Sequence, residues 1–178
     1  MATVELQQQY NNVINSLYEE VEIFGFVDEQ FSELMENEGN PGFVRECLSS
    51  ISDDIRTALN GIRTTLNNEP VDDGKLDRCL FGLYYSSSRM GAKRVKNIYV
   101  TFCGFCVEKK RDECLQCLQQ VKQEFNLFKD KVEELLQIEN QILLAGGTIS
   151  TRYRHKLHRG KRSSSSSMKE ELQFDMQL

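Results

Sequence analysis

A long apolar stripe between residues 115 and 142 constrains the fold more than any other feature of the sequence. Apolar side chains recur there at steps of three and four residues, which places them on one side of an α-helix. A helix with so long an apolar side needs other helices packed along its length, and this predicts an antiparallel helical bundle. The stripe consists of Leu115, Leu118, Val121, Phe125, Phe128, Val132, Leu135, Ile138 and Ile142.

The rest of residues 1–150 repeats this helical spacing, and no segment alternates as a β-strand does. Before the long helix we expect one over residues 4–24, a short second helix through Phe31 and Met35, and a third that follows Asn40-Pro41 and reaches Leu66. A fourth should start at Asp72 or Asp73, and a fifth should carry Val95, Ile98, Phe102 and Phe105. The predicted fold class is therefore all-α, with an antiparallel four-helix bundle in a single domain over residues 1–150.

Start and stop signals divide these helices. Asp28 can cap the short second helix, Asn40-Pro41 can begin the third, and Asp72 or Asp73 can begin the fourth. The chain pauses at Gly91, and Gly146-Gly147 ends the last helix.

The charge is unevenly distributed along the chain. Residues 1–150 hold 15 Lys and Arg against 24 Asp and Glu, a balance of −9, whereas residues 151–178 hold 7 against 3, a balance of +4. The acidic body argues against nucleic acid as a partner, because phosphate binding needs clustered cations. We expect the basic, Ser-rich segment 151–178 to be a disordered tail, with a nuclear localisation or anion-binding patch as the alternative.

Several other function classes are also excluded. No apolar run is long enough to span a bilayer, so we expect no membrane partner. The beginning, MATVELQQQY, lacks the features of a secretory leader, and we therefore expect a cytoplasmic and nuclear protein with reduced thiols.

The cysteine spacing could suggest a metal site. Cys103-x-x-Cys106 and Cys114-x-x-Cys117 look like two halves of a zinc site. Both pairs lie within helical stripes, however, and no Gly or Pro knuckle could wrap a metal. We therefore interpret these cysteines as small packing residues and expect no metal.

The sequence contains no recognisable enzyme active site. Its 2 histidines, His155 and His158, both lie in the predicted tail, so residues 1–150 lack this side chain as base, nucleophile or ligand. Neither a GxxxxGK[ST] nor a GxGxxG loop is present, and we expect no cofactor.

One group of aromatic residues is unusual. Leu76, Leu80 and Leu83 mark the inward side of the fourth predicted helix, whereas Phe81, Tyr84 and Tyr85 fall on another side. We call these three residues the aromatic patch. It is either exposed and able to meet a partner, or buried beneath another helix.

Residues 7–148 resemble the plant histidine-containing phosphotransfer proteins of the cytokinin two-component pathway. The motif of that family is similar to His-Gln-Leu-Lys-Gly-Ser-Ser-Ser-Ser-Ile-Gly-Ala, and this chain has FGLYYSSSRMGA followed by KRVKN. Four further stretches agree in order: FVDEQFSEL, NPGFVRE, CLQCLQQVKQEF and IENQILLAGG. The resemblance implies two additional N-terminal helices docked on the four-helix bundle.

The departures from the motif concern its chemistry. The phosphoryl-accepting His of the family falls at Phe81, its Gln at Gly82, its Lys at Tyr84 and its small Gly at Tyr85. The chain therefore resembles a pseudo member of the family, which keeps the bundle and is not an enzyme.

The resemblance also implies partners. They are the receiver domains of hybrid histidine kinases and response regulators, for which this chain would compete with active phosphorelay carriers. The alternative is a helical interaction module that has lost receiver docking and uses the aromatic patch for another partner or for self-association. The sequence does not indicate an oligomeric state. The expected partner-binding residues are Phe81, Tyr84, Tyr85, Ser88, Arg89 and Lys93.

Overall fold

The chain forms a helical bundle. A computed structural model describes residues 2–18, 25–36 and 42–149. Within these residues the regular elements are all helices, and one isolated antiparallel bridge joins Val27 to Ala92. The helices are α1 (Ala2–Tyr18), α2 (Glu29–Glu36), α3 (Phe43–Leu66), α4 (Asp73–Arg89), α5 (Lys93–Val107) and α6 (Arg111–Leu144).

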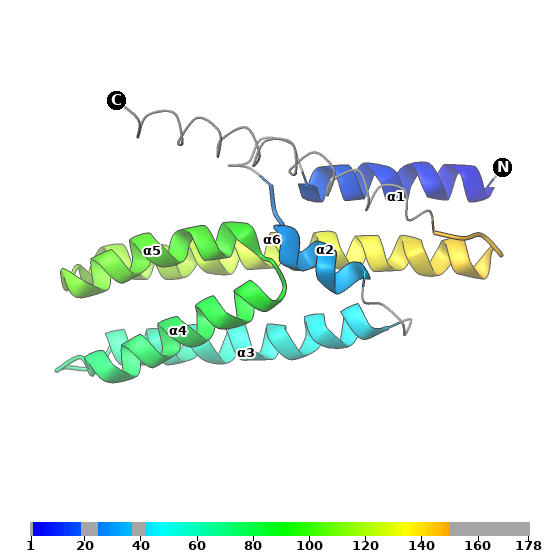
Figure 1. Cartoon of the computed structure of the whole chain (residues 1–178). Coiled ribbons are helices and arrows are strands. Elements are labelled where there is room, and N and C mark those ends of the chain that lie inside the picture. Colours follow the sequence, from blue (N-terminus) through cyan, green and yellow to red (C-terminus); the bar gives the residue numbers. More distant parts are fainter. Residues whose placement is uncertain (1, 19–24, 37–41, 150–178) are drawn as a thin grey trace, which may run out of the picture.

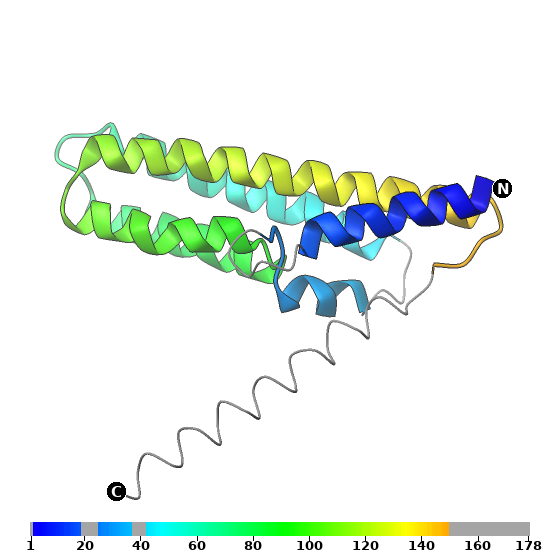
Figure 2. The ribbon, with the colours of Figure 1, turned by 90° about the horizontal axis from the view of Figure 1, so that it is seen from above.

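Helices α3 to α6 run alternately up and down and form the four-helix bundle (Figure 1). α3 and α6 are longer than α4 and α5, and α1 lies along the half of α6 that extends beyond α5 (Figure 2). α2 lies across the same end of the bundle (Figure 1). The predicted fold class, with two additional N-terminal helices, is confirmed. No helix among the described residues has the length and apolarity needed to cross a membrane.

The core follows the predicted stripes. On α6 every member of the 115–142 stripe is buried except Leu115, which is half-buried. The largest fully buried side chains include Phe31 of α2, Phe102 of α5 and Phe128 of α6. Phe31 and Phe128 meet edge to face, with ring centroids 6.2 Å apart. The short α2 is thus anchored to the longest helix of the bundle.

The predicted helix starts are partly confirmed. Asp28 Oδ1 accepts a hydrogen bond from the Gln30 N–H at 3.0 Å, and Asp72 Oδ1 accepts one from the Lys75 N–H at 2.8 Å. Both carboxylates cap helices as expected. α3 begins at Phe43, after Gly42 with φ 118°.

Some predictions concern segments outside the described residues. The first helix is described only as far as Tyr18, so the predicted extension over 19–24 lies outside them. The same holds for Asn40-Pro41 and for the tail over residues 151–178.

The pause at Gly91 is the joint between α4, α5 and the segment before α2. Gly91 has φ 66°, and its carbonyl accepts a hydrogen bond from the Asp28 N–H at 3.0 Å. The Lys93 N–H donates in turn to the Phe26 carbonyl at 3.0 Å. A Cβ at residue 91 would lie 2.5 Å from the Phe31 backbone nitrogen. Only glycine satisfies both the left-handed backbone and this close approach.

We therefore expect Gly91→Ala to lower the free energy of unfolding by about 2 kcal/mol, through backbone strain and the clash with α2. For a chain of this size that corresponds to a fall in Tm of roughly 4–8 °C. Gly104→Ala is the matched control, because a Cβ at residue 104 meets nothing within 4 Å and alanine favours the helix. Thermal unfolding followed by circular dichroism measures both variants. An unchanged Tm for Gly91→Ala would contradict the conclusion that this position requires glycine.

Candidate functional site

The two sides of α4 differ sharply in exposure. Leu76, Leu80 and Leu83 are at most 3% exposed and pack into the core. On the other side, Phe81 is 62%, Tyr84 39% and Tyr85 56% exposed. The aromatic patch therefore lies on the surface of the described structure, and the alternative in which another helix buries it is wrong. Helical spacing separates the two sets of residues on one helix.

Phe81 and Tyr85 stack on successive turns of α4. Their ring centroids lie 6.4 Å apart with an interplanar angle of 19°. The guanidinium carbon of Arg89 lies 5.9 Å from the Tyr85 ring centroid. The strip Phe81–Tyr85–Arg89 thus combines two rings with one cation, and these are residue types favoured at the centres of protein interfaces.

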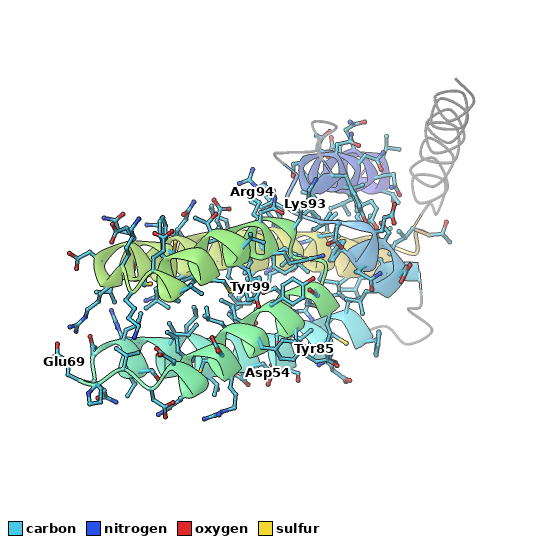
Figure 3. All side chains as sticks on the ribbon, turned by 60° about the vertical axis from the view of Figure 1, so that its left-hand side comes forward. Asp54, Glu69, Tyr85, Lys93, Arg94 and Tyr99 are labelled. Carbon is cyan, nitrogen blue, oxygen red and sulfur yellow. The ribbon has the colours of Figure 1, made fainter. Side chains whose placement is uncertain are left out.

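Tyr84 turns toward α5. Its ring lies 4.8 Å from the Tyr99 ring, centroid to centroid, at 35°. A hydrogen bond with Cys103, and secondarily burial, raises the pKa of Tyr99, so its hydroxyl stays protonated. Figure 3 shows Tyr99 on α5, on the side that faces α4. Tyr84 therefore widens the surface across two helices.

Sequence reasoning missed Tyr99. Tyr99 follows Ile98, which belongs to the predicted apolar stripe of α5, but Tyr99 itself is not part of that stripe. The stripe therefore did not mark Tyr99 as a neighbour of α4. The signal that could have found it is the antiparallel pairing of α4 with α5, which brings the middle of each helix to the other.

The serine run ends in an unusual side chain. Ser86 and Ser87 are buried, and Ser87 Oγ donates to the Leu83 carbonyl at 2.7 Å. Ser88 Oγ is also buried, yet it has no hydrogen-bond partner within the described part of the chain. The predicted contact residue Ser88 therefore presents little of its hydroxyl to solvent.

The cations at the beginning of α5 already have partners within the fold. Lys96 forms a salt bridge with Asp28. Arg94 Nη1 lies 3.3 Å from Glu124 Oε2. The guanidinium carbon of Arg94 is 3.8 Å from the Phe26 ring centroid. These contacts hold the segment before α2 against α5 and α6.

Lys93, the last of the predicted contact residues, is half-buried at the first position of α5. Figure 3 shows Lys93 and Arg94 at the end of α5 toward α2, whereas Tyr85 lies on α4. The structure thus brings Phe81, Tyr84, Tyr85 and Arg89 together and leaves Lys93 to one side.

The chemistry available at this surface is limited. Histidine does not occur among residues 1–150. The described residues contain no group of three or more His, Cys, Asp or Glu side chains arranged to hold a metal. Rings and one exposed guanidinium remain, and such a surface can bind a protein through apolar burial and cation–π contacts.

Comparison with known proteins identifies a consistent set of relatives. No protein-family model matches the chain. Histidine-containing phosphotransfer protein 5 of Arabidopsis thaliana is 41% identical over 152 residues, covering 84% of this chain and 94% of the relative. Pseudo histidine-containing phosphotransfer protein 6 of Arabidopsis thaliana is 33% identical, covering 80% and 92%. The crystal structure of a histidine-containing phosphotransfer protein from Medicago truncatula superimposes with a TM-score of 0.71 at 30% identity, covering 80% of this chain and 96% of that one.

Proposed function

This chain belongs to the histidine-containing phosphotransfer protein family, and we propose that it is a catalytically inactive member that docks on receiver domains. The observation that carries the proposal is Phe81, an exposed residue on α4 at the motif position of the phosphoryl-accepting histidine. A phenyl ring has no nitrogen to attack a phosphoryl group. Residues 1–150 contain no histidine that could accept the phosphoryl group in place of the missing one.

The neighbouring substitutions support the same proposal. By the family motif, Tyr84 stands in place of a lysine, and its ring packs on Tyr99. The patch therefore lacks the cation that would offset phosphoryl charge at that position. Tyr85 stands in place of a small glycine and is 56% exposed. This surface therefore lacks groups that phosphoryl transfer needs, and it has apolar contact area in their place.

Docking without transfer makes the chain a competitor. Its partners are the receiver domains of hybrid histidine kinases and response regulators, which it withholds from active phosphorelay carriers. We further propose that it acts in the cytoplasm and the nucleus, where it damps cytokinin signalling. The relatives that are themselves named pseudo proteins support the inactive assignment.

A second candidate function rests on Tyr85. A bulky ring at a motif position that is otherwise glycine opposes the original approach of a receiver domain. The stacked pair Phe81 and Tyr85 would then serve another protein or a second copy of this chain.

Binding to a panel of purified receiver domains separates the two candidates. We expect the full-length chain to bind at least one receiver domain saturably. When no receiver domain is present, the chain should sediment as a single species. Binding to no receiver, together with self-association that Phe81→Ala abolishes, would replace the first proposal by the second.

A further inference from the structure

Four of the six cysteines gather where α5 ends and α6 begins. Cys103 and Cys106 lie on the last turns of α5, and Cys114 and Cys117 on the first turns of α6. All four are free thiols, and the Sγ atoms of Cys106 and Cys114 are 3.4 Å apart. The proposed docking function does not use this cluster, which lies at the end of α4 and α5 remote from α2 (Figure 1).

We propose that Cys106 and Cys114 are a redox modification site, where hydrogen peroxide joins them in a reversible disulfide between α5 and α6. The α5–α6 turn brings the two thiols together, and this disulfide does not depend on receiver docking.

The turn holds the two sulfurs in position. The Lys110 N–H donates to the Phe105 carbonyl at 2.9 Å, and the Lys109 N–H donates to the Cys106 carbonyl at 3.1 Å. Since a disulfide bond is about 2.05 Å long, the sulfurs must approach by about 1.4 Å. Disulfide formation requires that rotation of the two short side chains provides this movement, while the backbone hydrogen bonds keep the helices in register.

Burial assigns different roles to the two thiols. Cys106 is half-buried and therefore the more accessible of the two residues, whereas Cys114 is 1% exposed. The Cys106 thiolate attacks one peroxide oxygen, the O–O bond breaks, and hydroxide leaves, which forms a sulfenic acid. The Cys114 thiolate then attacks this sulfur, the S–S bond forms, the S–O bond breaks, and hydroxide leaves again. The two thiol protons and the two hydroxides become water, so two thiols and one peroxide give a disulfide and two waters.

The surroundings make the reaction slow at neutral pH. Burial raises the pKa of both thiols, while their mutual hydrogen bond raises the pKa of Cys106 further and partly offsets the rise in the pKa of Cys114. The titratable groups that act on the pair are Cys103 on α5 and Glu113 and Cys117 on α6. Because the thiolate is the reacting species, the rate should rise about tenfold per pH unit while the pH stays below these pKa values.

The test exposes the folded, reduced full-length chain to hydrogen peroxide at pH 7, 8 and 9 and then maps disulfides by mass spectrometry without reduction. We expect a peptide that joins Cys106 to Cys114, formed faster at each higher pH and removed by dithiothreitol. The cross-linked chain should melt about 5 °C higher, because the bond closes a loop in the unfolded chain.

Two variants test the assigned roles. Cys114→Ser should leave a sulfenic acid on Cys106 that dimedone captures, whereas Cys106→Ser should leave Cys114 unoxidised. Cys79→Ser, on α4, is the control and should cross-link as the parent does. No cross-link at pH 9, or one that instead joins Cys103 or Cys117, would overturn the proposal. The mapping on the parent chain gives this answer even where a serine variant unfolds.

Discussion

The Phe81→Ala, Tyr85→Ala double variant should bind a receiver domain about a hundredfold more weakly than the parent chain, with an almost unchanged Tm. Aromatic anchors at the centre of an interface often cost about 2 kcal/mol or more when truncated. Every 1.4 kcal/mol corresponds to a factor of ten in Kd, so the loss of two stacked rings reaches the hundredfold range. Folding should suffer little, because Phe81 and Tyr85 are 62% and 56% exposed and the inward leucines of α4 are untouched.

Calorimetric titration and thermal unfolding on the same preparation measure both quantities. The matched control is Val107→Ala with Leu144→Ala, which removes two exposed apolar side chains elsewhere, 82% and 80% exposed. This control should bind as the parent does. A large fall in Tm for the Phe81, Tyr85 variant would show that the rings support the core. Unchanged binding with an unchanged Tm would show that the aromatic patch is not the docking surface.

The second large effect concerns phosphoryl transfer. The parent chain should take no phosphoryl group from a phosphorylated receiver, and Phe81→His alone should restore little transfer. Tyr84 would still offer no positive charge, and Tyr85 would still obstruct the approach of the receiver. The triple variant Phe81→His, Tyr84→Lys, Tyr85→Gly should restore transfer, because it returns the acceptor, the cation and the small residue together.

A phosphoryl group on histidine is labile in acid and stable in base, so its label can be recognised and assigned to a peptide. This assignment matters because the chain has two histidines, His155 and His158, beyond residue 150. The control is Phe81→Ala, Tyr84→Lys, Tyr85→Gly, which has the same flanking changes and no acceptor. Label on residues 1–150 of the parent chain would contradict the inactive assignment. Efficient transfer by Phe81→His alone would show that Tyr84 and Tyr85 do no harm.

The helical architecture was predictable because it depends on local periodicity. The stripe of α6 repeats every three or four residues over its whole length, so neither a strand nor a loop fits it. The caps of Asp28 and Asp72 were predictable for the same reason, since each involves a backbone N–H within three residues. The position of Phe81 on another side of α4 than the leucines was also predictable, whereas its exposure was not, because spacing within one helix does not show whether a second helix covers that side.

Contacts between helices could not be derived in this way. The Tyr84–Tyr99 pair depends on the register of α4 against α5, and residue spacing within one helix contains no such information. The separation of Lys93 from the patch depends on how the Gly91 joint directs α5. The approach of Cys106 to Cys114 depends on the backbone of residues 107–110, including Lys109 with φ 56°.

A competition assay tests the central claim most directly. A phosphorylated receiver domain transfers its phosphoryl group to an active carrier, and the rate is measured at rising concentrations of the full-length chain. We predict that the rate falls hyperbolically toward zero, with an inhibition constant equal to the measured Kd for that receiver, while the chain itself stays unlabelled. The Phe81→Ala, Tyr85→Ala variant should inhibit only at about a hundredfold higher concentration. A transfer rate that is independent of the parent chain at concentrations far above that Kd would contradict the claim.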